Sequence, residues 1–146
     1  MYLNESIALL FESISKSDVQ GVKKSIEQGV DINSENENGR KAIFNAVGFE
    51  NLEVINILLN AGANPTDGLP AALMRQHIGI SKILVKAGAD MQAHLTESGQ
   101  TFLHAAIDTR MIELVRFLVN EKHSDINAKM KDGVTPLQLA EENGLN

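Results

Sequence analysis

A short pattern of apolar and small residues recurs along this chain, at a spacing of 33 or 34 residues in three of its four steps and of 26 in the other. A large aliphatic residue stands three places before a small one five times, in the pairs Leu10/Ser13, Ile43/Ala46, Leu69/Ala72, Leu103/Ala106 and Leu137/Ala140. Self-similarity at a spacing of about 33 residues is the mark of a repeat architecture. One such unit cannot bury its apolar face alone, whereas stacked units can. The chain is therefore expected to fold as a stack.

Two short helices are predicted for each unit. Thr101 can cap the first helix, because its hydroxyl oxygen accepts a hydrogen bond from a free backbone N–H. Pro136 fits the first turn of a helix, where its missing N–H costs nothing. The second helix carries apolar residues at helical spacing, as in Val54, Ile55, Leu58 and Leu59. Glycines in the left-handed conformation are expected to end these helices at Gly29, Gly62 and Gly88.

The phrase TFLHAA at residues 101–106 resembles the signature of the ankyrin repeat family. TPLQLA at 135–140, GAN at 62–64 and GAD at 88–90 extend the resemblance over nearly the whole chain. That family has a β-turn and two helices per repeat of about 33 residues. The resemblance implies a mainly α fold, an ankyrin-repeat solenoid of stacked helix-turn-helix units with short hairpin-like loops. It implies one domain, 1–146, with units at about 5–37, 38–64, 65–93, 94–129 and 130–146. It also implies that His104 is structural and bonds neighbouring loops.

Four stretches depart from the family pattern. Unit one lacks the usual capping phrase and has one apolar helical stripe, which suits an N-terminal capping unit. Asn4 or Ser6 is the expected N-cap of that helix. The stripe is formed by Leu3, Ile7, Leu10, Phe11 and Ile14. In unit two, the tetrapeptide 41–44 (KAIF) replaces the usual phrase. About seven residues are missing between units two and three relative to a 33-residue period, so the loop 62–67 is too short for the usual projecting hairpin, or finger. Unit four has one extra residue in 120–127 (NEKHSDIN) and no cap glycine.

Composition bears on several classes of function. The absence of cysteine excludes disulfides, thiol catalysis and thiolate zinc sites. The net charge of −6 argues against a nucleic-acid surface, which is usually basic. The sequence shows no apolar run long enough for a transmembrane helix and no secretory leader pattern. A cytoplasmic location is expected, with an exported effector as the open alternative.

No constellation of residues predicts catalysis. The four histidines lack the helical spacing of a zinc site. His77 stands in a structural place before a second helix, and His94 and His123 fall in loops. The acidic pair Glu141 and Glu142 is best interpreted as a solvated face, and no glycine-rich phosphate loop is present. We therefore expect no enzyme activity, no metal site and no cofactor.

Two classes of function remain. The first is a non-enzymatic protein–protein interaction module. The second is a regulatory or targeting ankyrin segment of a longer enzyme, effector or toxin–immunity system, which the half unit at the C-terminus favours. The acidic charge predicts a protein partner with a basic surface. Because unit five lacks a second helix, we expect either that the natural chain continues beyond Asn146 or that this end packs on a neighbour by self-association.

The resemblance places partner binding on a concave face made of finger tips and the exposed ends of the first helices. The finger residues are Glu35, Glu37, Arg40, Glu97, Gln100 and Lys131, and the helix ends are Phe49, Met74, Arg75, Asp108 and Thr109. The missing finger should leave a notch near Phe49, Met74 and Arg75. Phe49 is either a binding anchor there or folds back onto its loop.

Two leucines test the proposed register of the core. Leu103 and Leu137 hold the same place in successive units. Both are expected to be buried, each spanning a unit boundary.

Overall fold

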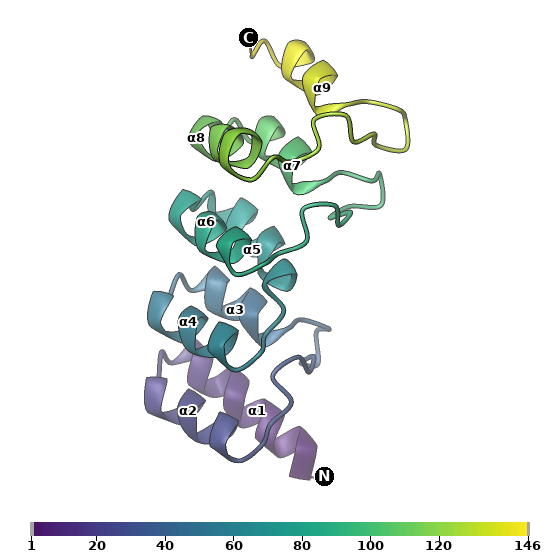
Figure 1. Ribbon diagram of the computed structural model, residues 1–146. Helices are drawn as coiled ribbons and strands as arrows, with labels where there is room; N and C mark the ends of the chain where they lie inside the picture. Colours follow the sequence, from purple (N-terminus) through teal and green to yellow (C-terminus); the bar gives the residue numbers. More distant parts are fainter. Residues whose placement is uncertain (1, 146) are drawn as a thin grey trace.

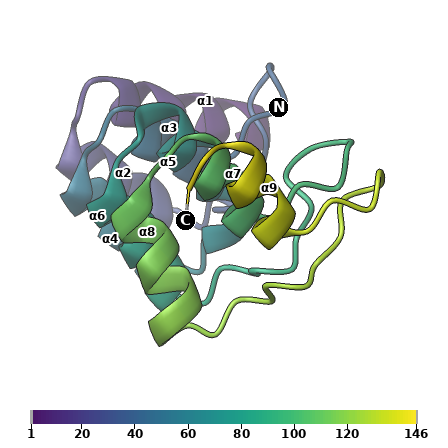
Figure 2. The same ribbon diagram turned by 90° about the horizontal axis from the view of Figure 1, so that it is seen from above.

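Pairs of helices stack into one column, with the first helices in one layer and the second helices in the other (Figures 1 and 2). The structure, a computed structural model, describes residues 2–145, and the side chains of residues 5–145. The pairs are α1 (Tyr2–Ser15) with α2 (Val19–Glu27), α3 (Ala42–Gly48) with α4 (Leu52–Asn60), α5 (Leu69–Arg75) with α6 (Ile78–Lys86), and α7 (Phe102–Asp108) with α8 (Ile112–Arg116). Then α9 (Pro136–Glu142) lies on α7. The predicted stack of helix-turn-helix units is confirmed, while the exact unit boundaries stay a prediction.

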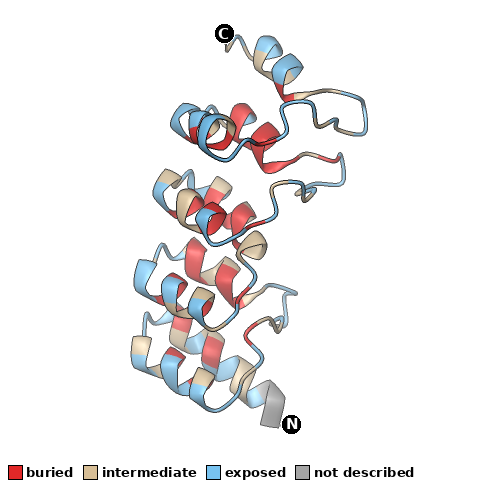
Figure 3. Ribbon diagram, viewed as in Figure 1, coloured by how far each residue is buried: buried red, intermediate tan, exposed pale blue. Residues whose placement is uncertain are grey.

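The core runs along the seam where the two layers face each other (Figure 3). Leu10, Ile43, Leu69 and Leu103 are all buried, as the register predicts. The small residues one turn further on, Ala46, Ala72 and Ala106, are fully buried between successive first helices. Because alanine adds so little bulk, neighbouring helices approach closely there and exclude water from the aliphatic column.

The prediction that Leu137 is buried is wrong. Its side chain is 63% exposed, although it holds the same place in α9 as Leu103 holds in α7. The aliphatic residue at this place is covered by the second helix of its own unit and by the next unit, as Leu10 is covered by α2 and α3. In the described part of the chain, α9 has α7 beneath it and no further helix above it.

The helix ends follow the predicted capping chemistry. Thr101 accepts a hydrogen bond from the backbone N–H of His104, and the His104 ring accepts one in return from the Thr101 N–H at 3.2 Å. Thr135 and Gln138 form the same reciprocal pair at the start of α9. The predicted left-handed glycines are confirmed, with φ of +84° at Gly29, +97° at Gly62 and +100° at Gly88.

The N-terminal stripe is confirmed in part. Ile14, like Leu10, is buried, and Ile7 and Phe11 are half-buried. Asn4 and Ser6 both lie inside α1, which begins at Tyr2, so the prediction that one of them caps this helix is wrong. The side chains of Leu3 and Asn4 lie outside the described residues.

The extra residue of unit four is absorbed by a wider helical turn. α8 continues into a π-helical turn, η2 (Phe117–Glu121), where Lys122 donates its N–H to the carbonyl of Phe117 at 3.2 Å. His123 then adopts a left-handed φ of +49° in the place that a glycine takes in the other units. The insertion therefore stays local, and Ser124 still bonds back to Leu118 at 2.9 Å.

Three fingers project from one side of the column (Figure 1). The first finger is 35–41, the second 95–100 and the third 130–134; each is closed by backbone pairing across its base. The second and third fingers contact each other, since the Lys131 N–H donates to the Ser98 carbonyl at 2.9 Å. Between α4 and α5 a short 3-10 turn, η1 (Pro65–Gly68), takes the place of a finger. The first finger consequently has no finger directly above it.

One buried hydroxyl gives a stability prediction. Ser81 of α6 is fully buried and its hydroxyl has no hydrogen-bond partner among the described residues, at a place where α2 and α4 have Val22 and Ile55. An unsatisfied buried polar group costs about 1–3 kcal/mol. We therefore expect Ser81→Ala to raise the free energy of unfolding by about 1 kcal/mol, measured by urea titration.

Ser25 provides the matched control for that experiment. It is also buried in a second helix, but its hydroxyl donates to the Gly21 carbonyl at 3.0 Å. Ser25→Ala is expected to leave stability unchanged or to lower it. A loss of stability in Ser81→Ala would contradict the interpretation that this hydroxyl is unsatisfied.

Candidate functional site

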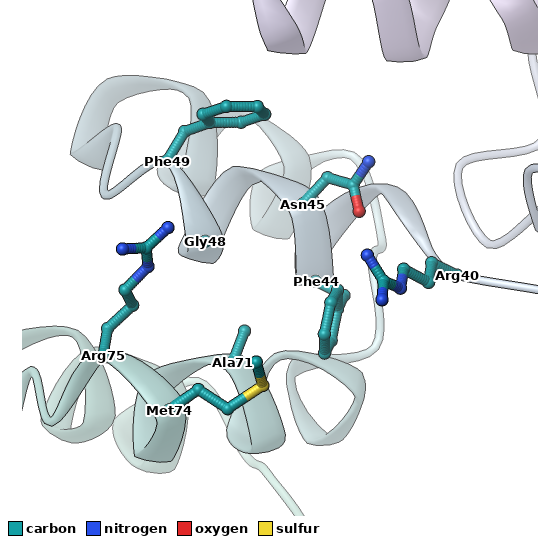
Figure 4. Close-up of a pocket in the computed structure, with 8 residues that line it drawn as sticks. All are labelled: Arg40, Phe44, Asn45, Gly48, Phe49, Ala71, Met74 and Arg75. Carbon is teal, nitrogen blue, oxygen red and sulfur yellow. The ribbon is translucent and has the colours of Figure 1, made fainter. Parts of the chain in front are cut away.

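The missing finger leaves a hollow on the inner side of the stack, between units two and three. The hollow has a volume of about 460 Å³ and is lined by Arg40, Phe44, Asn45, Gly48, Phe49, Ala71, Met74 and Arg75. We call these eight residues the notch (Figure 4). The structure thus places a concavity where the sequence predicted one, beside Phe49, Met74 and Arg75.

Two helix ends and one finger form the walls of the notch. Phe49 is the residue at which α3 ends; it is 53% exposed and lines the hollow, and the choice between a binding anchor and a ring folded back onto its loop stays a prediction. Met74, in the last turn of α5, is 74% exposed. Ala71 forms the floor and is buried. Large apolar side chains that are exposed beside a concavity are typical of binding surfaces.

The electrostatics of the notch differ from those of the whole chain. The chain has 19 acidic and 13 basic side chains, yet the notch contains two arginines and no acidic residue. Arg40 lies over the Phe44 ring at 5.1 Å from its centroid. Within the described residues, neither Arg40 nor Arg75 lies within ion-pairing distance of a carboxylate. Figure 4 shows the two arginines at opposite sides of the hollow.

Two further hollows continue the notch along the inner face. The first, which we call the finger gap, has a volume of about 420 Å³ and lies between the first finger, η1 and residues 93–95. It shares Arg40 and Phe44 with the notch. The second, of about 320 Å³, lies between α5 and the second finger and shares Met74 with the notch. The inner face is therefore hollowed from unit two to unit four.

The predicted residues of unit four lie at the second of these hollows. Gln100, Asp108 and Thr109 all line it. Their polar groups are already engaged, because the Gln100 amide donates to Asp108 at 2.6 Å and the Thr109 hydroxyl donates to the Ala105 carbonyl at 2.8 Å. Asp108 also accepts from the side chain of Asn143 at 3.2 Å. This part of the face is prearranged by its own hydrogen bonds.

The predicted acidic finger residues do not converge with the notch. Glu35 lines the finger gap and pairs with Lys41 at 3.3 Å. Glu37 lines a hollow on the other side of the first finger, beside α1. Glu97 and Lys131 are exposed on the second and third fingers and line none of the hollows described above. The structure brings together Arg40, Phe49, Met74 and Arg75 at the notch. The finger residues that lie apart from it, spread along the column, are Glu35, Glu37, Glu97 and Lys131.

Sequence reasoning missed four residues of the notch: Phe44, Asn45, Gly48 and Ala71. For Phe44 a signal was present, because it holds the place in its unit that His104 holds in unit four. His104 is fully buried and its Nε2 bonds the carbonyl of Val134 in the third finger at 3.1 Å. Unit two has no finger above it to supply such a carbonyl, and an aromatic side chain at the same place lines the hollow instead.

Two of the histidines have the structural roles that the sequence predicts. His104 links α7 to the third finger, as described, and the Nδ1 of His77 accepts a hydrogen bond from the Ile80 N–H at 3.0 Å, which caps α6. Within the described residues, no three His, Cys, Asp or Glu side chains come together as metal ligands would. In the same part of the chain, every helix is too short or too polar to cross a membrane.

The chain is similar to known proteins over 82% to 99% of its length. An ankyrin repeat protein of Fowlpox virus (strain NVSL) is 26% identical over 152 residues, which cover 99% of this chain and 20% of the relative. The nuclear factor NF-kappa-B p105 subunit of Gallus gallus is 26% identical over 133 residues, covering 84% of this chain and 14% of the relative. Rabankyrin-5 of Homo sapiens is 25% identical over 129 residues, covering 82% of this chain and 11% of the relative. The chain thus spans a fifth or less of the length of each of these three relatives.

A family model supports the same assignment. The model described as ankyrin repeats in three copies matches residues 69–146, which is more than half of the chain. The matched region begins at α5 and includes both signature phrases, at Thr101 and at Thr135. With its stacked helix pairs, capped phrases and projecting fingers, this chain belongs to the ankyrin repeat family.

Proposed function

We propose that this chain is a non-enzymatic interaction module that binds a protein partner on its concave face, with the notch as the anchor point. Ankyrin repeats are generally modules for protein–protein interaction. The observation that supports the notch is the exposure of Phe49 and Met74 beside a hollow of about 460 Å³. Aromatic and arginine side chains carry much of the energy at protein interfaces, and the notch contains both types.

A second candidate is that these repeats regulate or target a longer enzyme, effector or toxin–immunity protein. The observation that favours it is that the chain spans a fifth or less of the relatives described above. Both candidates use the same concave face. The size of the native protein, measured by immunoblotting of its source cells, separates them.

Three finer properties stay predictions. The acidic finger residues Glu35, Glu37 and Glu97 favour basic patches on the partner where it meets the fingers. The exposed Leu137 on α9 favours self-association through that end of the stack. A cytoplasmic location is proposed from the sequence alone, with export as an effector as the alternative.

Removing an anchor side chain should weaken binding without unfolding the stack. We expect Phe49→Ala and Arg75→Ala each to weaken partner binding by about 1–3 kcal/mol. Both side chains are exposed, so the melting temperature should stay nearly unchanged. The partner is first isolated with the wild-type chain and identified by mass spectrometry, then purified, and its affinity is measured by titration calorimetry.

Leu52→Ala is the matched control for Phe49→Ala. Leu52 is also a large apolar residue with 46% of its side chain exposed, but it lies in α4 and outside the notch. Its replacement should leave the affinity for the same partner intact. Equal affinities for the wild type and both notch variants would show that the notch is not the anchor.

A further inference from the structure

We infer that the notch accepts a linear segment of the partner that carries an acidic side chain next to a large apolar one. This deepens the proposed function and rests on it. The whole-chain charge favours a basic partner surface, whereas the chemistry of the notch itself favours a carboxylate. The two statements concern different parts of the same interface.

The charge argument rests on the two arginines. Two of the chain's four arginines line the notch, where no acidic residue accompanies them. Arg110 shows the contrast, because its guanidinium donates to the Asn143 carbonyl at 3.2 and 3.0 Å. Within the described residues, the side chains of Arg40 and Arg75 donate no hydrogen bond. Five planar donors on each guanidinium match the two oxygens of a carboxylate, which makes this the best-fitting anion on a protein.

The apolar argument rests on the side chains between the arginines. Phe44, Phe49 and Met74 surround the hollow in Figure 4, and Phe49 and Met74 are mostly exposed. Burying such surface is favourable by about 25 cal/mol per Å². Methionine also adapts its shape to the group that contacts it. An apolar side chain of the partner therefore fits between the two guanidinium groups.

The neighbouring finger gap limits how much negative charge the segment can carry. This gap is continuous with the notch through Arg40 and Phe44, and it also contains Glu35, Lys41 and Asp67. Glu35 is paired with Lys41 at 3.3 Å, so an extended segment that runs from the notch into the gap meets the carboxylate of Asp67, which forms no ion pair among the described residues. A single carboxylate beside an apolar residue is therefore favoured over a run of acidic residues or a doubly charged phosphate.

A displayed library of random 12-residue peptides tests this inference. Selection on the wild-type chain should enrich peptides with Asp or Glu next to a large apolar residue. The strongest binder is then synthesised with a fluorophore, and its affinity is measured by anisotropy. We expect Arg75→Glu and Arg40→Glu each to weaken binding about tenfold, which corresponds to about 1.4 kcal/mol. Arg116→Glu, which changes an exposed arginine of α8 outside the notch, should have no effect.

A charge exchange sharpens the test. A peptide with Lys in place of its acidic residue should bind the wild type weakly and recover affinity for Arg75→Glu or Arg40→Glu. A phosphoserine in the same place should bind no more tightly than Glu; tighter binding would overturn the carboxylate assignment.

The outcomes separate this inference from the proposed function. Suppose that the selected peptides lose affinity for Phe49→Ala but contain no acidic residue, or bind both arginine variants as well as the wild type. The notch is then an anchor and the acidic assignment is wrong. If no peptide is selected, or if binding is insensitive to Phe49→Ala and to both arginine changes, the inference of a linear segment in the notch is wrong. The partner titration with Phe49→Ala and Arg75→Ala then decides the proposed function by itself.

Discussion

Leu103→Ala is expected to lower the free energy of unfolding by about 2–5 kcal/mol, as truncation of a buried leucine generally does. Leu103 is 2% exposed in α7, which packs against α5 on one side and α9 on the other. The substitution removes apolar contacts at a unit boundary and leaves a cavity that stiff helices fill poorly. Because each unit is stabilised by its neighbours, the loss should appear as a lower midpoint for the whole array. Urea unfolding followed by circular dichroism measures it.

The chain contains the control for this experiment. Leu137 holds the same place in α9 but is 63% exposed, so Leu137→Ala should change stability by no more than about 0.5 kcal/mol. Equal losses in the two variants would show that Leu103 is not a boundary residue. An unchanged urea midpoint in Leu103→Ala would contradict the proposed register, in which Leu103 holds the buried aliphatic place of its unit.

His104→Ala is expected to have the second largest effect. The His104 ring is fully buried, accepts from the Thr101 N–H at 3.2 Å and bonds the Val134 carbonyl at 3.1 Å. Its loss leaves the buried backbone N–H of Thr101 without an acceptor, which costs about 1–3 kcal/mol of stability. It also leaves a cavity. The expected decrease in the free energy of unfolding is therefore about 3 kcal/mol. Amide hydrogen exchange should also show faster opening of the third finger.

His104→Gln separates the two bonds of the ring. Gln138 holds the same place in α9, where its side-chain oxygen accepts from the Thr135 N–H at 2.9 Å. A glutamine at 104 should therefore keep the cap of α7 while losing the bond to Val134, and it should cost less than alanine does. Equal costs for alanine and glutamine would show that the cap contributes nothing measurable.

Most of the fold could be predicted because its determinants are local or recur with the repeat period. The cap at Thr101, the left-handed glycines and the buried aliphatic column each depend on a few neighbouring residues and on the repeat period. Leu137 could not be predicted from its phrase, because its exposure depends on what packs against α9. The π-helical turn could not be predicted either. One extra residue can be accommodated by a longer loop or by a wider helical turn, and the sequence pattern does not distinguish the two.

The candidate site was predictable only in outline. The short spacing between units two and three indicated a notch, and the helix ends supplied Phe49, Met74 and Arg75. Gly48 and Ala71 line the notch from inside α3 and α5, where the sequence pattern shows only small residues of a helix. Their role arises from the distance between two helices. A single sequence does not report that distance.

The η1 turn has a consequence for how such a chain can change over generations. Where its neighbours have a finger, units two and three have four residues of 3-10 turn, and yet α3 and α5 still pack together. In a stack whose parts touch only their neighbours, a loop can shorten without disturbing the register elsewhere. Shortening also uncovers surface that the lost loop would have shielded. A deletion can therefore expose a concavity lined by residues that were already present, and point substitutions can then adapt that concavity to a partner.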